Sequence, residues 1–337
     1  MKQKKFYILL TMLLIASMTL AACTPATPVV EQPKGKTYKL AAIFPGVITD
    51  ADYNTLAYIG ISELQKATGI ETTYSESVAV PDIDRVMREY IDGGYNIIWT
   101  HGGQFVNQTV DLARLFPDVV FISEGDAPIE NPPANLWFID RNFHVGFYGI
   151  GALAARLTET GKICYLGGLT LPFSYAEVHA IQQAIKDSGK DIELKAAWTG
   201  DFNDPIKARQ VADALIAEGC DVIMGSLNLG MFGLFESVKA SPTKVYVTAK
   251  YTNKAIFAPD NYVTSLIYDF AGPLTEIYNK IQAGETGGYY PLGFATGVTL
   301  QLPLKNVSAE VQTEMGAIIT DLQAGKIEVV KDISEIK

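Results

Sequence analysis

Residues that build metal, redox and catalytic sites are scarce in this sequence. Its 337 residues include three cysteines and three histidines, and His101, His144 and His179 stand at no metal-ligand or triad spacing. Gly102-Gly103 lacks the further glycines of a phosphate-binding loop, and Ser226 lacks the glycine spacing of a nucleophile elbow. So few cysteines also exclude a disulfide-stapled miniprotein. We therefore predict no enzymatic activity, no cofactor and no metal.

Positive charge is scarce as well. The chain has 27 Lys+Arg against 37 Asp+Glu and a formal net charge of -10. Because an acidic surface repels a phosphate backbone, we expect no nucleic-acid partner. With 19% charged and 48% hydrophobic residues, the composition is that of a folded protein. The length is sufficient for two packed domains.

One long hydrophobic run is present, and it lies at the N-terminus. Three lysines precede it, Phe6–Ala22 is almost wholly apolar, and it ends on Leu20-Ala21-Ala22-Cys23. A membrane-spanning helix would need about 20 apolar residues and usually a cationic flank on the far side. Threonines and prolines follow here instead. The pattern therefore predicts a signal peptide over residues 1–22.

The end of this leader resembles the lipobox of bacterial lipoproteins. The resemblance implies that Cys23 is lipidated and becomes the first mature residue, so that acyl chains hold the protein on a membrane surface. Residues 23–37 contain three prolines and no apolar period, which is typical of a tether. We expect an extracytoplasmic protein anchored to the cell membrane, whose mature chain has 24 basic and 37 acidic residues, a net charge of -13.

Strand-like and helix-like segments alternate from residue 38 onward. Strands are predicted at Tyr38–Phe44, Glu71–Ser77, Asn96–Thr100, Val119–Ser123 and Leu136–Ile139. Helices are predicted at Thr55–Thr68, Ile83–Gly93 and Val106–Phe116. This alternation indicates a parallel sheet covered on both faces, and we assign residues 38–141 to an N-terminal α/β lobe.

The same rhythm starts again after a predicted helix at Val145–Thr160. Strands are predicted at Lys162–Leu166, Glu193–Trp198, Val222–Gly225 and Lys244–Thr248, with helices at Tyr175–Ser188, Pro205–Glu218 and Met231–Lys239. Residues 142–260 form a second α/β lobe in this interpretation. The elements Tyr262–Ile267, Pro273–Ala283, Phe294–Leu300 and Ala309–Ala324, within 261–337, are expected to complete both lobes. The predicted fold is α/β, with two lobes that are each a doubly wound, mostly parallel sheet.

The loops that follow the strands are the expected place for a ligand, because open parallel sheets bind ligands beyond their carboxyl ends. These loops combine glycines, single polar side chains and aromatic rings, a mixture that suits a flat, neutral ligand with polar edges. The candidate ligand-binding residues are Asp50, Tyr53, Asn54, His101, Gly102, Phe105, Glu124, Tyr175, Phe202, Ser226, Asn228, Lys250 and Tyr268.

Three motifs and their order resemble a known family. They are Asp50-x-x-Tyr53-Asn54-x-x-x-Tyr58-x-Gly60, Phe116-Pro117-Asp118, and Phe202-x-Asp204-Pro205. Together with the lipobox they are similar to the basic membrane protein family, lipoproteins related to the purine nucleoside receptor that serve ABC importers. The resemblance implies a type I periplasmic-binding-protein fold, a purine base or nucleoside ligand, and permease subunits as partners. We expect a monomer.

The resemblance also implies roles for residues of the first loop. Tyr53 stands where the family stacks an aromatic ring on the base, although it could instead pack on the next helical turn. Asn54 and Asp50 match polar residues near the base edge. Asp50 could equally be a helix cap, and capping is the role that we favour for Asp52. The aromatic ring on the other face of the base could come from Phe173, Tyr175 or Phe202. No single residue is assigned, because the position that best matches the second aromatic residue of the family is Glu177. Trp198 is interpreted as a core residue.

This chain departs from the family at the ribose-binding pair. The segment Ala249–Asn253 has no Asp, and Tyr268 with Asp269 beside it stands where the family has a Lys. Either the charge has swapped, with Lys250 facing Asp269, or the ligand has no ribose. We favour a free purine base or a related heterocycle over a nucleoside. Cys164 and Cys220 are interpreted as small buried residues, and whether they are bonded is left open.

Two other functions remain open at this point. A ligand sensor for a membrane signalling partner would have the same two lobes. An extracytoplasmic nucleoside hydrolase would need a carboxylate that activates water, for which Asp50 or Glu124 could serve.

Overall fold

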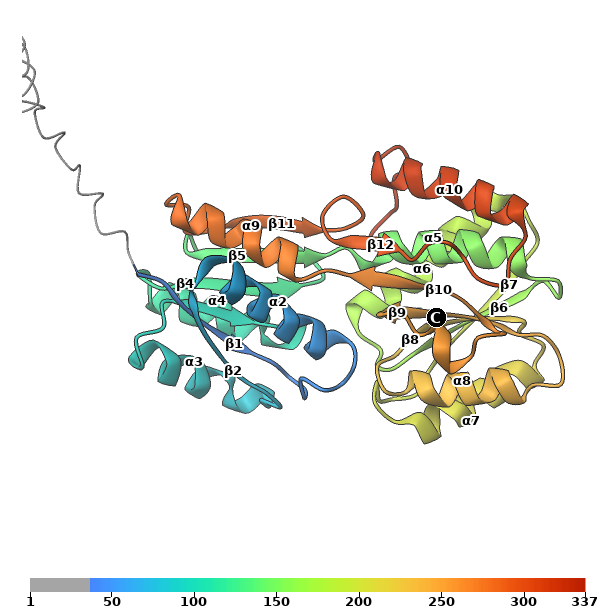
Figure 1. The fold of residues 1–337 in the computed structure, drawn as a ribbon, viewed down its shortest axis with the longest axis horizontal. Coiled ribbons are helices and arrows are strands. Elements are labelled where there is room, and N and C mark those ends of the chain that lie inside the picture. The colour runs from blue at the N-terminus through green and yellow to red at the C-terminus, as the bar shows by residue number, and fades with distance from the viewer. Residues whose placement is uncertain (1–36, 337) are drawn as a thin grey trace, which may run out of the picture. The chain divides into compact units, whose positions relative to one another are not determined.

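A computed structural model describes residues 37–336, and Tyr38–Lys337 forms one compact unit. The predicted signal peptide, the predicted lipidation site Cys23 and the predicted tether up to residue 36 lie outside the described residues. Within the described part, twelve strands form two sheets of six (Figure 1). The predicted α/β class is confirmed.

The first sheet has the strand order β11-β5-β4-β3-β1-β2, and every neighbouring pair is parallel. Its strands are β1 (Lys39–Ile43), β2 (Glu71–Ser75), β3 (Ile97–Thr100), β4 (Val120–Gly125), β5 (Leu136–Arg141) and β11 (Gly288–Leu292). Helices α3 (Ile83–Asp92) and α4 (Val106–Leu115) cover one face, and α2 (Tyr53–Thr68) and α9 (Ala271–Gln282) cover the other. Successive side chains point to opposite faces, so the near-continuous apolar runs in β1, β3 and β4 make both faces apolar.

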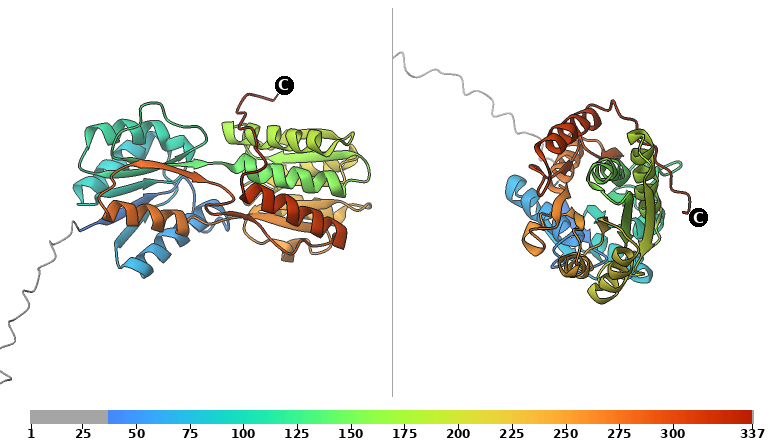
Figure 2. Two further views of the ribbon diagram at one scale, coloured as in Figure 1. Left: turned by 90° about the horizontal axis from the view of Figure 1, so that it is seen from above. Right: turned by 90° about the vertical axis from the view of Figure 1, so that its right-hand side faces the viewer.

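The second sheet repeats this order as β12-β10-β9-β8-β6-β7, with one antiparallel pair, β10 and β12. Its strands are β6 (Lys162–Gly167), β7 (Glu193–Trp198), β8 (Val222–Ser226), β9 (Tyr246–Tyr251), β10 (Tyr262–Tyr268) and β12 (Val298–Leu300). Helices α7 (Pro205–Ala217) and α8 (Met231–Ala240) cover one face, and α5 (Phe143–Leu157) and α6 (Pro172–Ser188) cover the other. Helix α10 (Ala309–Gln323) packs against α5 (Figure 2).

The chain passes between the two sheets three times. It crosses from β5 to α5, returns from β10 to α9, and crosses again from β11 to β12. The sequence missed β11 and predicted one strand at Phe294–Leu300, of which only β12 is a strand. The sequence pattern did not indicate a strand at β11, because Gly288 and Pro291 are residues typical of loops. Pro291 is tolerated because β11 is an edge strand, where a missing N–H donor breaks no ladder.

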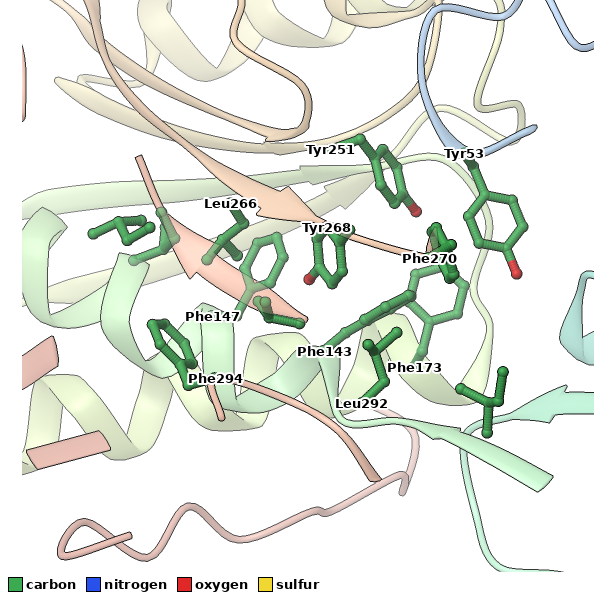
Figure 3. Close-up of a cluster of buried hydrophobic side chains, with 14 of the residues drawn as sticks. Tyr53, Phe143, Phe147, Phe173, Tyr251, Leu266, Tyr268, Phe270, Leu292 and Phe294 are labelled. Carbon is green, nitrogen blue, oxygen red and sulfur yellow. The ribbon is translucent and has the colours of Figure 1, made fainter. Parts of the chain in front are cut away.

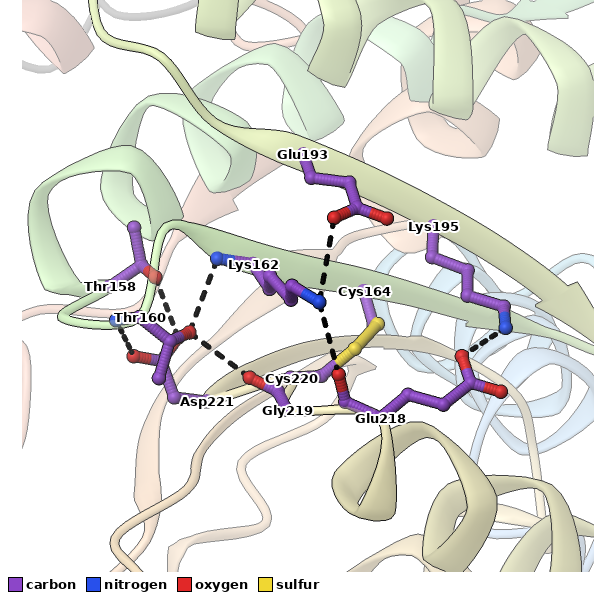
Figure 4. The surroundings of a disulfide bond; sticks show 10 residues. All are labelled: Thr158, Thr160, Lys162, Cys164, Glu193, Lys195, Glu218, Gly219, Cys220 and Asp221. Atoms are coloured by element: carbon purple, nitrogen blue, oxygen red, sulfur yellow. Dashed lines mark hydrogen bonds and ion pairs between the residues drawn. A yellow bond between two sulfur atoms is a disulfide. The ribbon is translucent and has the colours of Figure 1, made fainter.

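A disulfide joins Cys164 on β6 to Cys220 in the turn after α7, with Cα atoms 5.9 Å apart (Figure 4). The sequence had left this pairing open. Both cysteines are buried, as expected for small apolar residues. Asp221, the next residue, accepts hydrogen bonds from the backbone N–H groups of Glu159 (2.7 Å) and Thr160 (2.8 Å). The α5–β6 turn and the α7–β8 turn are therefore tied together.

Candidate ligand-binding site

The carboxyl ends of the two sheets meet in a buried cluster of aromatic rings. The Tyr53 ring, at the start of α2, lies 5.8 Å from the Tyr251 ring at the end of β9, measured between centroids. The His101 ring after β3 lies 5.0 Å from the ring of Phe270, which follows β10. Phe143, at the start of α5, packs edge-on against Tyr268 at 4.7 Å (Figure 3). Aromatic rings thus gather at the strand ends, where a ligand site is expected.

Glu124 is the polar centre on the side of the first sheet. It ends β4 fully buried, and its Oε1 accepts from Trp99 Nε1 at 3.0 Å and lies 2.6 Å from His101 Nδ1. Its Oε2 accepts from the Tyr53 hydroxyl at 2.8 Å. Burial acts to raise the pKa of Glu124, but His101, Arg141 and the Tyr53 hydroxyl together hold it below its ordinary value. Glu124 is therefore an ionised carboxylate, and both of its oxygens are engaged by neighbouring side chains.

The predicted stacking residue Tyr53 is already stacked on one face. Its ring lies parallel to His101, with centroids 3.7 Å apart and an interplanar angle of 25°. Tyr251 and Phe270 approach at a tilt or edge-on, each at 5.8 Å. Burial raises the pKa of Tyr53 well above its ordinary value, so the phenol is neutral. The structure thus brings Tyr53, His101 and Glu124 together, as the sequence predicted for three candidate site residues.

Arg141, at the end of β5, was missed by the sequence interpretation. Its Nη2 donates to both oxygens of Asp126 at 2.8 Å, and its Nη1 donates to the Tyr53 hydroxyl at 3.0 Å. The guanidinium carbon lies 5.3 Å from the Phe143 ring and 5.6 Å from the Phe173 ring. Burial opposes the charge, but Asp126 and other acidic neighbours raise the pKa of Arg141, which is cationic. A charged pair directly after an apolar strand, Asp140-Arg141, was the available signal.

The Gly102-Gly103 turn makes room for this arginine. Gly102 has φ +134°, a conformation that other residues rarely adopt, and a Cβ on Gly103 would lie 2.6 Å from Arg141 Nη2. Phe105, which follows, is fully buried in the core between the first sheet and helices α3 and α4. Gly102 thus lies next to the cluster, whereas Phe105 is a core residue, which corrects its prediction as a ligand contact.

Lys250, near the end of β9, is the polar centre on the side of the second sheet. Its Nζ is fully buried, 2.5 Å from Glu177 Oε1 and 3.5 Å from the Ser226 hydroxyl. It also lies 4.1 Å from the centroid of the Phe143 ring and 4.8 Å from that of Phe173. Burial lowers the pKa of Lys250 against the opposing effect of Glu177. Ser226 and Lys250 are therefore together, as predicted.

The alternative in which the charge has swapped and Lys250 faces Asp269 is wrong. Asp269 is exposed and accepts from the backbone N–H groups of Ala271 (2.8 Å) and Gly272, so it caps the start of α9. The partner of Lys250 is Glu177, whose other oxygen accepts from the Tyr165 hydroxyl at 2.8 Å. Glu177 had been noted only as a mismatch to an aromatic position. A glutamate within an otherwise apolar helix face was the signal for a buried ion pair.

Asp50 is a helix cap in the structure, one of its two open roles. Its carboxylate accepts from the backbone N–H groups of Asp52 (2.9 Å), Asn54 (3.1 Å) and Thr55 (3.0 Å), and from the Asn54 side chain at 2.7 Å. Asn54 is buried beside it, and its Oδ1 has no partner among the described residues.

Asp52 does not cap α2, which contradicts the predicted role. It forms a buried ion pair with Lys254, and Thr252 Oγ1 donates to Asp52 Oδ1 at 3.3 Å. Because Lys254 follows β9 and Asp52 precedes α2, this pair joins the two sheets' loops. We call Asp52, Thr252 and Lys254 the clasp. Burial raises the pKa of Asp52 to about 7 against the opposing effect of Lys254.

The remaining aromatic candidates divide into two groups. Phe202 stacks on Phe173 with centroids 6.1 Å apart, and Phe173 packs against Phe143 at 5.9 Å, so both belong to the cluster. A Cβ on Gly168 would lie 2.1 Å from Phe202, so only glycine fits there. Tyr175 lies instead against Trp198, 6.0 Å away, and Trp198 is half-buried rather than a full core residue.

Asn228 contributes its backbone to this region. Its N–H donates to the Phe202 carbonyl at 3.0 Å, which fixes the loop that carries Phe202.

Comparison with known proteins gives the family. A family model described as ABC transporter substrate-binding protein, PnrA-like, matches residues 37–329. The chain belongs to this family. The PnrA-like match spans both sheets and all three passages of the chain between them. The resemblance to the basic membrane proteins that the motifs suggested is thus confirmed.

Individual PnrA-like relatives agree with this assignment. Basic membrane protein A2 of Borrelia garinii subsp. bavariensis is 28% identical over 267 residues, which cover 77% of this chain and 78% of that protein. Basic membrane protein A of Borreliella burgdorferi is 27% identical over 286 residues, covering 82% and 83%. A putative ABC transporter glucose-binding protein of Haloferax volcanii is 27% identical over 256 residues, covering 74% and 62%.

Solved structures confirm the fold. An ABC transporter solute-binding protein of Aeropyrum pernix K1 superposes with a TM-score of 0.74 at 17% identity, covering 87% of this chain and 93% of that one. One from Conexibacter woesei gives 0.69 at 23% identity, covering 88% and 100%. The type I periplasmic-binding-protein fold expected for a PnrA-like protein is thus present.

No helix in residues 37–336 is long and apolar enough to cross a membrane. The same residues hold no group of three or more His, Cys, Asp or Glu side chains arranged for a metal ion.

Proposed function

We propose that this PnrA-like protein is the lipid-anchored substrate-binding subunit of an ABC importer and that it binds a free purine base or a purine nucleoside. The observation that carries the proposal is the cluster of aromatic rings and buried polar groups where the two sheets' carboxyl ends meet. Rings from both sheets enter it, among them Tyr53 from one side and Tyr251 from the other. A flat heterocycle binds well between such rings, while the polar groups contact its edge.

Stacking on these rings gives the affinity an import protein needs. Base stacking on a protein aromatic contributes about 1–3 kcal/mol per ring. Stacking on Tyr53 and on one ring from the second sheet, Phe202, Phe173 or Tyr251, would supply much of a binding free energy of about -8 to -12 kcal/mol. That range corresponds to a dissociation constant between about 1 μM and 1 nM.

A free base is favoured over a nucleoside because the described residues place no free carboxylate at the positions where the family binds ribose. Tyr268 stands in place of the lysine, and Asp269 is used as the cap of α9. Both carboxylates named as possible catalytic groups are also engaged. Asp50 accepts from the first turn of α2 and Glu124 from Trp99 and Tyr53, so neither is placed to activate water. We therefore propose binding without turnover.

Isothermal titration calorimetry with hypoxanthine, adenine, inosine and glucose tests this function. Glucose is included because the Haloferax volcanii relative is named for it. We expect one site per chain, a dissociation constant of about 1 μM or lower for at least one purine base, and weaker binding of inosine. Absence of heat with every purine, or tighter binding of glucose, would overturn the proposal. Release of hypoxanthine from inosine would overturn binding without turnover.

The membrane anchor is a separate part of the proposal. We propose that Cys23 is lipidated after removal of residues 1–22, so that the two-lobed body is held at the outer side of the cell membrane. Mass spectrometry of the protein purified from a bacterial membrane fraction should give a chain that begins at Cys23 and carries acyl groups. A Cys23→Ala variant should leave the membrane fraction. An unmodified chain, or one that retains residues 1–22, would contradict the anchor.

A further inference from the structure

We infer that Arg141 is a specificity-determining residue that donates a hydrogen bond from Nε to a carbonyl oxygen of the ligand, so that the site selects oxo-heterocycles, such as 6-oxopurines, over amino-heterocycles. The inference deepens the proposed function and rests on it.

The first observation is an unused donor. Arg141 is 6% exposed, and its Nε is buried without a hydrogen-bond partner among the described residues. Leaving a buried N–H unpaired is unfavourable, and more so for a charged group, because the donor has lost its water. A site that binds a small molecule can hold such a donor for the ligand. The position of Arg141 supports this, since Arg141 ends β5 and so lies at the carboxyl end of the sheet, where the aromatic rings meet.

The second observation is that the direction of this donor is fixed. Nη2 is held by both oxygens of Asp126, and Nη1 donates to the hydroxyl of Tyr53. The planar guanidinium also lies against the rings of Phe143 and Phe173. Because a guanidinium is rigid, these contacts set where Nε points, and little entropy is lost when a ligand accepts from it. Lysine could not reproduce this geometry.

A second buried polar group without a partner belongs to a residue that also contacts the Phe143 ring. The Tyr268 hydroxyl is buried without a partner among residues 37–336, and the Tyr268 ring packs on Phe143 at 4.7 Å. Arg141 and Tyr268 therefore both contact the Phe143 ring. Two unpaired polar groups around one aromatic ring match a flat ligand with polar atoms at its edge. Most buried polar groups in proteins are paired, so two unpaired groups that share one aromatic neighbour are candidates for ligand contacts.

The charges of the cluster indicate that the acceptor is neutral. Arg141 is paired with Asp126, Lys250 with Glu177, and Lys254 with Asp52, and the Glu124 carboxylate lies 2.6 Å from His101 Nδ1. These groups leave no surplus positive charge for an anionic ligand such as a nucleotide. A ring carbonyl accepts from Nε without bringing charge. An exocyclic amine at that position would face Nε as a second donor, which is unfavourable.

The test compares hypoxanthine with adenine, which differ in the 6-oxo and 6-amino edge. Calorimetry on the full mature chain at pH 7.5 should show that the wild type binds hypoxanthine at least tenfold more tightly than adenine. Arg141→Lys keeps the positive charge beside Asp126 but removes the Nε geometry. It should weaken hypoxanthine binding at least tenfold, change adenine binding less than threefold, and so abolish the preference. Arg156→Lys, which alters a surface pair with Glu314, is the matched control and should keep the preference.

The readout is the ratio of two affinities, which a merely structural role would not change. A wild type that binds adenine as tightly as hypoxanthine overturns the inference while the proposed function stands, as does an Arg141→Lys variant that loses both ligands equally. A wild type that binds no purine overturns both. If Arg141→Lys does not fold by circular dichroism, Asp126→Asn, which releases one side of the guanidinium, should lower the hypoxanthine-to-adenine preference. An unchanged preference in that variant would contradict the inference.

Discussion

At the scale of single residues, ligand binding should depend most on the Tyr53 ring, because it is the aromatic of α2 at the meeting point of the two sheets. Tyr53→Ala should weaken binding of the preferred purine by about 5- to 150-fold, since about 1–3 kcal/mol of stacking is lost. Tyr58→Ala is the control, because Tyr58 packs against Tyr74 one helical turn away. Calorimetry measures both. Equal affinities of Tyr53→Ala and wild type would exclude stacking on Tyr53.

Asp52 should couple ligand binding to protons. We expect the clasp to open when the lobes separate, which returns the pKa of Asp52 from about 7 towards 3.8. Between these values the closed form holds more protons than the open form, so a fall in pH favours closure and ligand binding. Lys254 opposes this shift and Asp50 adds to it. Titrations at about pH 5.5 in two buffers of different ionisation enthalpy should show proton uptake on binding.

The control for this coupling is Asp52→Asn, which keeps the shape of the side chain and cannot titrate. Its proton uptake should be smaller than that of the wild type at the same pH. If the two proteins take up equal numbers of protons, the clasp does not titrate on closure.

The sequence revealed part of the site at this scale. Tyr53, His101, Glu124, Ser226 and Lys250 were found because polar or aromatic residues directly follow apolar strands. Arg141 and Glu177 were missed because a sequence does not show which buried charges pair with one another. The exchange of roles between Asp50 and Asp52 depends on one backbone turn before α2, where Ala51 has φ +60°. Such a turn is not readable from side-chain type alone.

At the scale of elements, the C-terminal segment after α10 fixes the crossing from β5 to α5. Lys331 in this segment pairs with Asp140 at the end of β5, and Val329 offers its backbone to His144 on α5. His144 is buried, and burial together with Lys331 lowers its pKa from 6.5 to about 4. The segment is thereby coupled to the protonation of one histidine.

This histidine should make stability depend on pH. Because the unfolded chain binds the His144 proton more tightly than the folded one, stability is lost as pH falls below about 6.5 towards 4. Between pH 7 and pH 5 the loss from this group is about 2 kcal/mol. Urea denaturation of wild type and His144→Gln at both pH values measures it. The variant should lose less stability on acidification, and identical losses would contradict the assignment.

The disulfide ties two elements that are 56 residues apart in sequence. Closing a loop of this length in the unfolded chain should stabilise the protein by about 4 kcal/mol by the chain-entropy estimate. Denaturation with and without a reductant should show a lower midpoint for the reduced wild type. The double variant Cys164→Ala with Cys220→Ala should have a low midpoint that the reductant does not change. If the reductant still lowers the denaturation midpoint of the double variant, reduction of the Cys164–Cys220 disulfide is not the cause of that effect.

Most helices and strands were predictable, because apolar residues follow a period of two or 3.6 in them. Asp204 with Pro205 marked the start of α7, and the Asp204 side chain accepts from the backbone N–H groups of Ile206 and Lys207 at 3.0 Å. Strand β11 was not predictable, since its glycine and proline are tolerated only at a sheet edge. The order of strands within each sheet also lies beyond such patterns, because it depends on which segments pair.

At the scale of the whole molecule, two sheets of the same strand order present their carboxyl ends to one shared cluster. Each sheet alone has half of the groups, with Tyr53, Glu124 and Arg141 from the first and Glu177, Lys250 and Tyr251 from the second. A ligand at this place contacts both halves, and the three passages of the chain between the sheets are the natural positions for a hinge. The clasp then closes over the bound ligand.

A crystal structure of the protein grown with hypoxanthine tests the central claim most directly. The account predicts a purine ring stacked on Tyr53, with a ring from the second sheet on its other face and its oxygen within hydrogen-bond distance of Arg141. A purine bound outside the cluster, or a cluster that stays empty at a saturating concentration of hypoxanthine, would contradict the account.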